Sequence, residues 1–233
     1  METKKARSTP QSRRERPAKP ALSRQGIVEA ALTILRDEGL EKVTMRRIAT
    51  ALDTGPASLY VYVRDTEDLH AQILDALLDS GSEATLSDGT WQERLKMRLT
   101  SYMYVLFKYP EMARMAMSTQ PTGPHYLALV DTILALLNEG GVPDREAAWA
   151  VDLLLQFATA NAVEHGLLRP TPQPADEESA LILELVNLEA TLYPQIARLG
   201  AELFGGTGLE RFEWSLDVLL AGVSSTHRPP NHD

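Results

Sequence analysis

Two tyrosines, Tyr60 and Tyr62, lie in the short stretch "GPASLYVYVRDTEDL" at positions 55–69. Hydroxyl groups donate hydrogen bonds to phosphate oxygens, and small or apolar side chains can contact thymine methyl groups. A helix this short is not stable alone, so one side of it must pack against other elements. The other side is then free to contact a ligand, although aromatic residues on a short helix belong more often to a core.

Capping residues and helical periodicity predict the elements that position this stretch. Ser23 and Gly39 suit the start and the end of a first helix, whose apolar residues recur at helical spacing. Thr44 suits the N-cap of a second, shorter helix. Residues 53–55 then form a turn, and Pro56 suits the first turn of a third helix. Two short helices joined by a tight turn predict a helix-turn-helix, whose second helix enters the DNA major groove.

On the third helix, Leu59 and Val63 lie one turn apart and are expected to pack against the preceding helices. The side chains left on the outer faces are Pro56, Ala57, Ser58, Tyr60, Val61 and Tyr62. Arg46 and Arg47, near the start of the second helix, can reach a base edge or a phosphate. This surface suits DNA.

The rest of the chain is also predicted to be helical. Asp65 opens a fourth helix, and no alternating strand pattern follows it. Further helices are expected over about 90–108, 111–118, 124–139, 144–168, 177–190, 194–204 and 208–222. The predicted fold is therefore all-α.

Charge is distributed unevenly along the chain. Residues 1–24 carry eight Lys/Arg and two acidic residues, whereas residues 25–70 have a net charge of −3 and the remainder −12. This asymmetry predicts a basic arm that meets a polyanion and an acidic body held away from it, but a solvated tail would give the same pattern. Because residues 25–70 are net acidic, we expect the arm to supply much of any affinity for DNA.

Several classes of protein are not expected. The chain has no cysteine, which excludes disulfides and thiolate chemistry. There is no apolar N-terminal signal, and the most apolar stretch, 147–163, is interrupted by polar residues, so we expect a cytoplasmic protein without a membrane span. The five histidines lack metal-ligand spacing, and no phosphate-loop, dinucleotide or nucleophile-elbow motif is present. We therefore expect no enzyme, no metal and no resident cofactor.

Two segments of the acidic body suggest that two chains pair. The helix expected near 144–168 is apolar nearly all round, and apolar residues recur at helical spacing near 208–222. A homodimeric bundle would bury both, whereas the alternative is that both are core helices of a monomer.

Methionines and aromatic residues on neighbouring helices suit an adaptable pocket for a small hydrophobic or aromatic ligand, although they also fill cores. Polar residues on the most apolar helix could line such a pocket, or bond across a dimer interface or to backbone. The candidate ligand-binding residues are Met103, Phe107, Met115, Gln156, Asn161 and His165. The identity of this effector is not indicated.

Residues 23–80 resemble the DNA-binding domain of the tetracycline-repressor (TetR) family of bacterial transcriptional regulators. The resemblance lies in the segment EGLEKVTMRRIATAL, the P-x-S-L-Y recognition helix and the D-x-x-D-L start of the linker helix. Residues 193–223 are similar to the end of the C-terminal domain in the branch closest to the tetracycline repressor itself. The resemblance implies a homodimeric repressor that binds a palindromic operator and is released by a small molecule.

The resemblance also implies roles for single residues, with three departures. Asp53 occupies a turn position that is usually glycine, and Thr66 stands where the family often has a phosphate-binding lysine, for which Arg64 can substitute. Pro56 stands where the tetracycline repressor has a base-contacting glutamine. The operator sequence of that repressor therefore cannot be inferred for this chain. The predicted DNA-binding residues are Thr44, Arg46, Arg47, Pro56, Ala57, Ser58, Tyr60, Val61, Tyr62, Arg64 and Thr66.

The predicted organisation is a disordered basic arm over 1–21, a DNA-binding domain with its linker helix over 22–80, a ligand-binding and dimerisation domain over 81–224, and a disordered tail over 225–233. The departures at Pro56 and Thr66 leave one alternative function open. This is a small-molecule-binding protein with the same fold that has lost operator binding.

Overall fold

The computed structural model describes residues 21–79, 88–118, 122–167, 191–227 and 229, and over these residues it contains helices and no strand. The α-helices are α1 Arg24–Glu38, α2 Met45–Ala51, α3 Pro56–Leu59, α4 Thr66–Asp79, α5 Trp91–Lys108, α6 Pro110–Ser118, α7 Pro124–Glu139, α8 Asp144–Leu167, α10 Pro194–Leu199 and α11 Gly208–Ser225. Short 3-10 helices cover Leu40–Lys42 and Gly200–Phe204. The all-α prediction is confirmed.

The helix boundaries follow local capping chemistry. The Ser23 hydroxyl accepts a hydrogen bond from the Gly26 N–H at 3.1 Å, and the Thr44 hydroxyl accepts one from the Arg47 N–H at 3.1 Å. Beyond α4, the expected helices match observed elements within three residues at each end, with 194–204 divided between α10 and a 3-10 helix. The helix expected at 177–190 lies outside the described residues, as do positions 1–20 of the predicted arm over 1–21 and most of the predicted tail.

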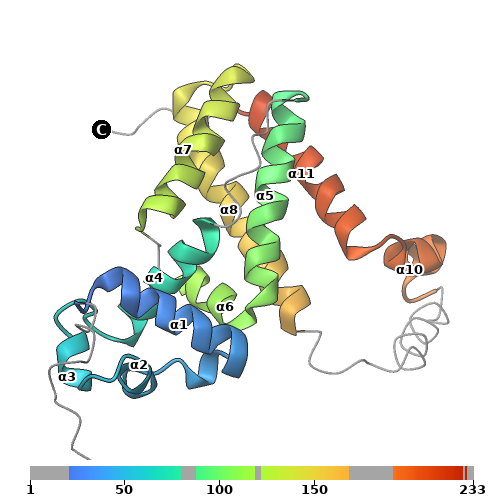
Figure 1. Ribbon diagram of the computed structural model, residues 1–233. Helices are drawn as coiled ribbons and strands as arrows, with labels where there is room; N and C mark the ends of the chain where they lie inside the picture. Colours follow the sequence, from blue (N-terminus) through green and yellow to red (C-terminus); the bar gives the residue numbers. More distant parts are fainter. Residues whose placement is uncertain (1–20, 80–87, 119–121, 168–190, 228, 230–233) are drawn as a thin grey trace, which may run out of the picture.

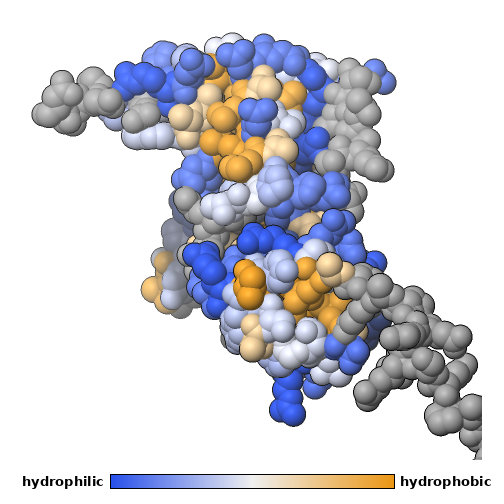
Figure 2. All heavy atoms as spheres, turned by 60° about the vertical axis from the view of Figure 1, so that its left-hand side comes forward, coloured by the Kyte–Doolittle hydropathy of each residue, from blue (hydrophilic) through white to orange (hydrophobic). Residues whose placement is uncertain are grey.

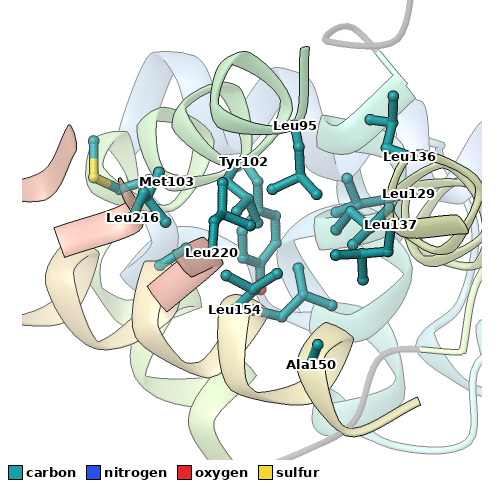
Figure 3. Packing of buried hydrophobic residues seen from close by; sticks show 14 of the residues in the cluster. Leu95, Tyr102, Met103, Leu129, Leu136, Leu137, Ala150, Leu154, Leu216 and Leu220 are labelled. Carbon is teal, nitrogen blue, oxygen red and sulfur yellow. The ribbon is translucent and has the colours of Figure 1, made fainter. Parts of the chain in front are cut away.

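The helices form two groups with separate hydrophobic cores. Figure 1 shows α1, α2 and α3 grouped at one end, with α5, α7 and α8 standing over them. Residues mainly of α1 to α4, among them Ile27, Ile48 and Leu59, form the N-terminal core together with Met112 of α6. Residues mainly of α5, α7, α8 and α11 form the C-terminal core, shown in Figure 3 with Tyr102 at its centre.

The helix α4 belongs to both cores. Its residues Leu69 and Ile73 are buried in the N-terminal core, and Leu74 and Leu78 are buried in the C-terminal core. Met115 of α6 also packs against both. A displacement of α4 therefore affects the two groups of helices together.

Hydrophobic side chains are not confined to the interior. The face shown in Figure 2 carries them in two separate areas, one over the upper part and one over the lower part, each bordered by hydrophilic residues. None of the helices in the described ranges is long and apolar enough to cross a membrane.

Candidate nucleic-acid interface and effector cavity

The turn between α2 and α3 is closed by backbone hydrogen bonds. The Asp53 N–H donates to the Thr50 carbonyl at 3.1 Å, and the Thr54 N–H donates to the Ala49 carbonyl at 2.9 Å. This pair of bonds is a Schellman motif, which requires a left-handed residue at its corner. Asp53 supplies it with a φ of 48°, the one positive φ among the described non-glycine residues. Aspartate therefore tolerates here the conformation for which glycine is usual.

The third helix is shorter than the sequence suggested. It spans only Pro56–Leu59, and the chain continues as a turn in which the Tyr62 and Val63 N–H groups donate to the Leu59 carbonyl at 2.9 and 3.0 Å. Leu59 and Val63 are both buried in the N-terminal core, as expected. These two anchors fix the orientation of every other side chain in the segment.

The side chains opposite these anchors face solvent. Tyr60 is 55% exposed and Val61 is 79% exposed. Pro56, Ala57 and Ser58 are exposed as well. Together these five residues form the surface that we call the α3 surface.

Tyr62 is placed differently from the rest of the predicted set. It is half-buried and packs against the N-terminal core, because α3 ends at Leu59 and the turn directs Tyr62 back towards the domain. Only part of its side chain is therefore available to a ligand.

The three predicted arginines have different environments. Arg47 donates two hydrogen bonds to the Glu38 carboxylate, from Nε to Oε2 at 3.2 Å and from Nη2 to Oε1 at 2.5 Å. These bonds lower the pKa of Glu38. The Arg46 side chain is exposed, and that of Arg64 is 85% exposed with its Nε 3.7 Å from an Asp68 oxygen. Arg46 and Arg64 are thus better placed to reach a phosphate than Arg47.

Two aspartates organise the start of α4. An Asp65 oxygen accepts from the Asp68 N–H at 2.8 Å, and an Asp68 oxygen accepts from the Arg64 N–H at 2.8 Å. Burial raises the pKa of Asp68, but the Arg64 N–H and further hydrogen bonds and charges outweigh it and lower the pKa. The arrangement fixes the backbone between the α3 surface and α4. Thr66 is exposed at this point, and the Thr44 hydroxyl is engaged as the cap of α2.

A small cavity of about 90 Å³ lies between α4, α5 and α7. Its lining residues are Leu78, Arg98, Ser101, Tyr102, Val105, His125, Ala128, Leu129 and Thr132. The Tyr102 hydroxyl lies 3.0 Å from the Thr159 hydroxyl of α8, and burial raises the pKa of Tyr102 to about 12. This cavity combines an apolar wall with several polar groups, as small-molecule sites do.

The five predicted ligand-binding residues whose side chains are described do not line this cavity. Met103 is buried in the C-terminal core, Phe107 and Met115 pack partly buried against it, and the His165 side chain lies outside the described part. Gln156 donates to an Asp152 oxygen at 2.7 Å, and the Asn161 amide donates to the Phe157 carbonyl at 3.0 Å. The structure therefore does not bring these five residues together, and the Gln156 and Asn161 amides bond within α8.

Sequence reasoning missed the polar residues of α5 and α7 that line the cavity. Arg98, Ser101 and Tyr102 recur at helical spacing on one side of α5, which was the available signal. Their meeting with His125 and Thr132 depends on packing between helices distant in the sequence.

A wide groove of about 730 Å³ lies between α8 and α11. Trp149 and Leu153 of α8 line it with Val218 and Leu219 of α11, and the first three are 55%, 45% and 49% exposed. Gln156 lies at this groove as well. Such a contiguous apolar surface on two helices is typical of a protein–protein contact.

Residues 84–227 match the family model described as "Tetracyclin repressor-like, C-terminal domain", and residues 27–73 match that described as "Bacterial regulatory proteins, tetR family". The chain belongs to the TetR family. It is a ligand-responsive transcriptional repressor. TetR proteins bind DNA operators and small-molecule ligands as dimers. TetR regulators are in general not enzymes. In the described ranges, no three His, Asp or Glu side chains are grouped as a metal ion would require.

Individual TetR proteins are similar over nearly the whole chain. The HTH-type transcriptional repressor DrrR1 of Streptomyces coeruleorubidus is 31% identical over 90% of this chain and 82% of its own length. The TetR family protein ActR of Streptomyces coelicolor, solved in complex with actinorhodin, is 32% identical with a TM-score of 0.77, over 88% of this chain and 96% of that one. The class C tetracycline repressor of Escherichia coli is 24% identical over 90% of this chain and 94% of its own length.

Proposed function

We propose that this TetR protein represses transcription as a homodimer that binds a palindromic operator through two α3 surfaces, and that an aromatic or hydrophobic effector in the cavity between α4, α5 and α7 releases it. The observation that carries the proposal is the division of the segment after Gly55 into a buried side and an exposed side. Leu59 and Val63 are buried in the N-terminal core, so the hydroxyl-bearing and apolar side chains on the other side of the segment face solvent.

For operator binding, we assign the α3 surface to the major groove. Ser58 and Tyr60 would donate hydrogen bonds to phosphates, and Ala57 and Val61 would contact base edges or thymine methyl groups. Arg46 and Arg64 would add contacts to the backbone of the duplex. Proline at position 56 has no N–H and no polar side chain, so apolar contacts and DNA shape would carry more of the specificity.

For dimerisation, we assign the apolar groove to the contact between two chains. Helices α8 and α11 would pack against the same two helices of a second chain, which covers Trp149, Leu153 and Val218. A two-fold axis through this bundle would place the two α3 surfaces on the same side of the dimer. Two half-sites about one helical turn of DNA apart would then be reached together.

For release, we assign the effector to the small cavity. A volume of about 90 Å³ is too small for a multi-ring molecule, so an effector of the kind bound by ActR would have to separate α4 from α5 and α7. Because α4 is anchored in both cores, its displacement would move the N-terminal helices and change the distance between the α3 surfaces. The effector must bind the displaced state more tightly, since equal affinity shifts no equilibrium.

The test is fluorescence anisotropy with DNA from upstream of the protein's own gene, titrated with the wild type and with Tyr60→Phe and Arg46→Ala. We expect saturable binding of one dimer per site and weaker binding by both variants. Addition of actinorhodin as a probe would show whether an effector of that class releases the DNA. No binding to the upstream region or to any duplex selected from a random pool would overturn the proposal in favour of a small-molecule-binding protein.

A further inference from the structure

Asp75 of α4 is the one charged side chain that is buried among the described residues, with 7% of its surface exposed. It accepts a hydrogen bond from the backbone N–H of Tyr126, in the first turn of α7, at 2.9 Å. A buried carboxylate is costly unless it is bonded, so this contact compensates part of its desolvation. The bond joins two helices that are distant in the sequence.

The first turn of α7 lacks a cap of its own. Gly123 is its N-cap and has no side chain, and Pro124 has no N–H to donate. Exposed N–H groups and the helix dipole make this end of α7 favourable for a negative charge. Asp75 therefore does from another helix what an N-cap residue normally does within one.

The close approach of Asp75 requires glycine at position 123. A Cβ atom there would overlap the carboxyl group of Asp75. Any larger residue would consequently displace the carboxylate from the end of α7.

A second contact lies one turn further along α4. Asp79 Oδ1 is 3.3 Å from His125 Nδ1, and His125 and Leu78 both line the proposed effector cavity. The Asp75 contact thus lies between this cavity and the part of α4 that is buried in the N-terminal core. Figure 1 shows α4 beside the end of α7 where this contact is made.

We propose that Asp75 is a positioning residue that couples the effector cavity to operator binding by capping α7 from the linker helix. The proposal rests on the proposed function. An effector that separates α4 from α7 has to break or shift this cap, and an operator that fixes α4 has to preserve it. Coupling between two sites is reciprocal, so operator binding should stabilise the first turn of α7 even though α7 belongs to the other core.

The experiment measures hydrogen exchange by mass spectrometry in peptides covering 123–130 of the full-length dimer. The protein is compared free and bound to a duplex that it selects from random DNA. We expect DNA to slow exchange in the first turn of α7 about five- to tenfold, at the lower end of ordinary coupling energies. Asp75→Asn keeps the shape and an acceptor oxygen but removes the charge, and Gly123→Ala displaces the carboxylate without changing it. Both should lose most of the DNA-dependent change.

Asp131→Asn, on an exposed position of α7, is the matched control and should keep the wild-type change. A cap with a purely structural role would predict faster exchange in both states of Asp75→Asn with an unchanged ratio between them. That result, or a wild-type ratio of one, would overturn the proposal. If Gly123→Ala does not fold by circular dichroism, Asp75→Asn decides alone. If the wild type selects no duplex, the proposed function is overturned, and the proposal with it.

Discussion

Leu59 is the last residue of the four-residue helix α3 and Tyr60 follows it directly, yet the two side chains lie in opposite environments. Leu59 is completely buried in the N-terminal core, whereas Tyr60 is 55% exposed. The same short segment therefore contains an anchor and a contact surface, and substitutions at the two positions should have separable effects.

Tyr60→Phe should weaken operator binding about tenfold per half-site, because a hydrogen bond to a charged phosphate contributes about 1.5 kcal/mol. Its midpoint of thermal unfolding should not change. Leu59→Ala should instead reduce the free energy of unfolding by about 2–5 kcal/mol. Fluorescence anisotropy measures the operator affinity of both variants, and urea unfolding measures their free energies of unfolding. Loss of stability in Tyr60→Phe would show that the tyrosine is part of the core.

Arg46→Ala and Arg47→Ala should differ although the two residues are adjacent. Arg46 is exposed, so its removal should lower operator affinity and reduce the slope of log K against log salt by about 1 per subunit if it contacts a phosphate. Arg47 is held by Glu38, so its removal should leave the salt slope nearly unchanged. Titrations at several salt concentrations provide the comparison. A larger change in the salt slope for Arg47→Ala than for Arg46→Ala would mean that Arg47 leaves Glu38 when DNA binds.

Leu153→Glu should convert the dimer to a monomer, since it places a charge in the apolar groove between α8 and α11. Sedimentation velocity should then show a single species of 25.7 kDa. Leu127→Glu is the matched control, because Leu127 is 55% exposed on α7 away from that groove. A Leu153→Glu protein that remains dimeric would exclude this face as the subunit contact.

Because of Tyr102, the free energy of unfolding should fall as the pH becomes alkaline. Burial raises the pKa of Tyr102 to about 12, above the ordinary value for tyrosine, so the unfolded chain loses this proton first. The contribution is fully present below pH 10 and is lost as the pH rises towards 12. Tyr102→Phe should remove that part of the decline, which is measured against wild type because Tyr126 also has a raised pKa. At neutral pH the variant should cost only about 1 kcal/mol, since the Thr159 hydroxyl keeps its bond to the Leu155 carbonyl.

Removal of residues 1–21 should weaken operator binding and flatten its salt dependence. These residues carry seven Lys/Arg and two acidic residues, whereas residues 25–70 are net negative. Fewer counterions are released when fewer positive charges meet the phosphates. An unchanged salt slope in the truncated protein would contradict this role for the arm.

The features that were predictable from the sequence depend on local interactions. Ser23 and Thr44 cap their helices, and Asp53 adopts the left-handed conformation, because each needs only neighbours within a few residues. The cavity that we propose for the effector was not predictable, because it forms where α4, α5 and α7 meet. The partial burial of Tyr62 was missed for a related reason. It depends on where α3 ends, and helix ends are the least certain part of a periodicity argument.

The two buried residues that anchor this segment make contacts that do not involve the exposed side chains of the α3 surface. Leu59 and Val63 specify where the segment lies, while the exposed positions contribute little to the core. Substitutions at Pro56, Ala57, Ser58 or Val61 can therefore accumulate while the protein still folds. A gene duplicate of this protein could acquire a new target site through a handful of codon changes, with its scaffold and its response to a chemical signal left intact.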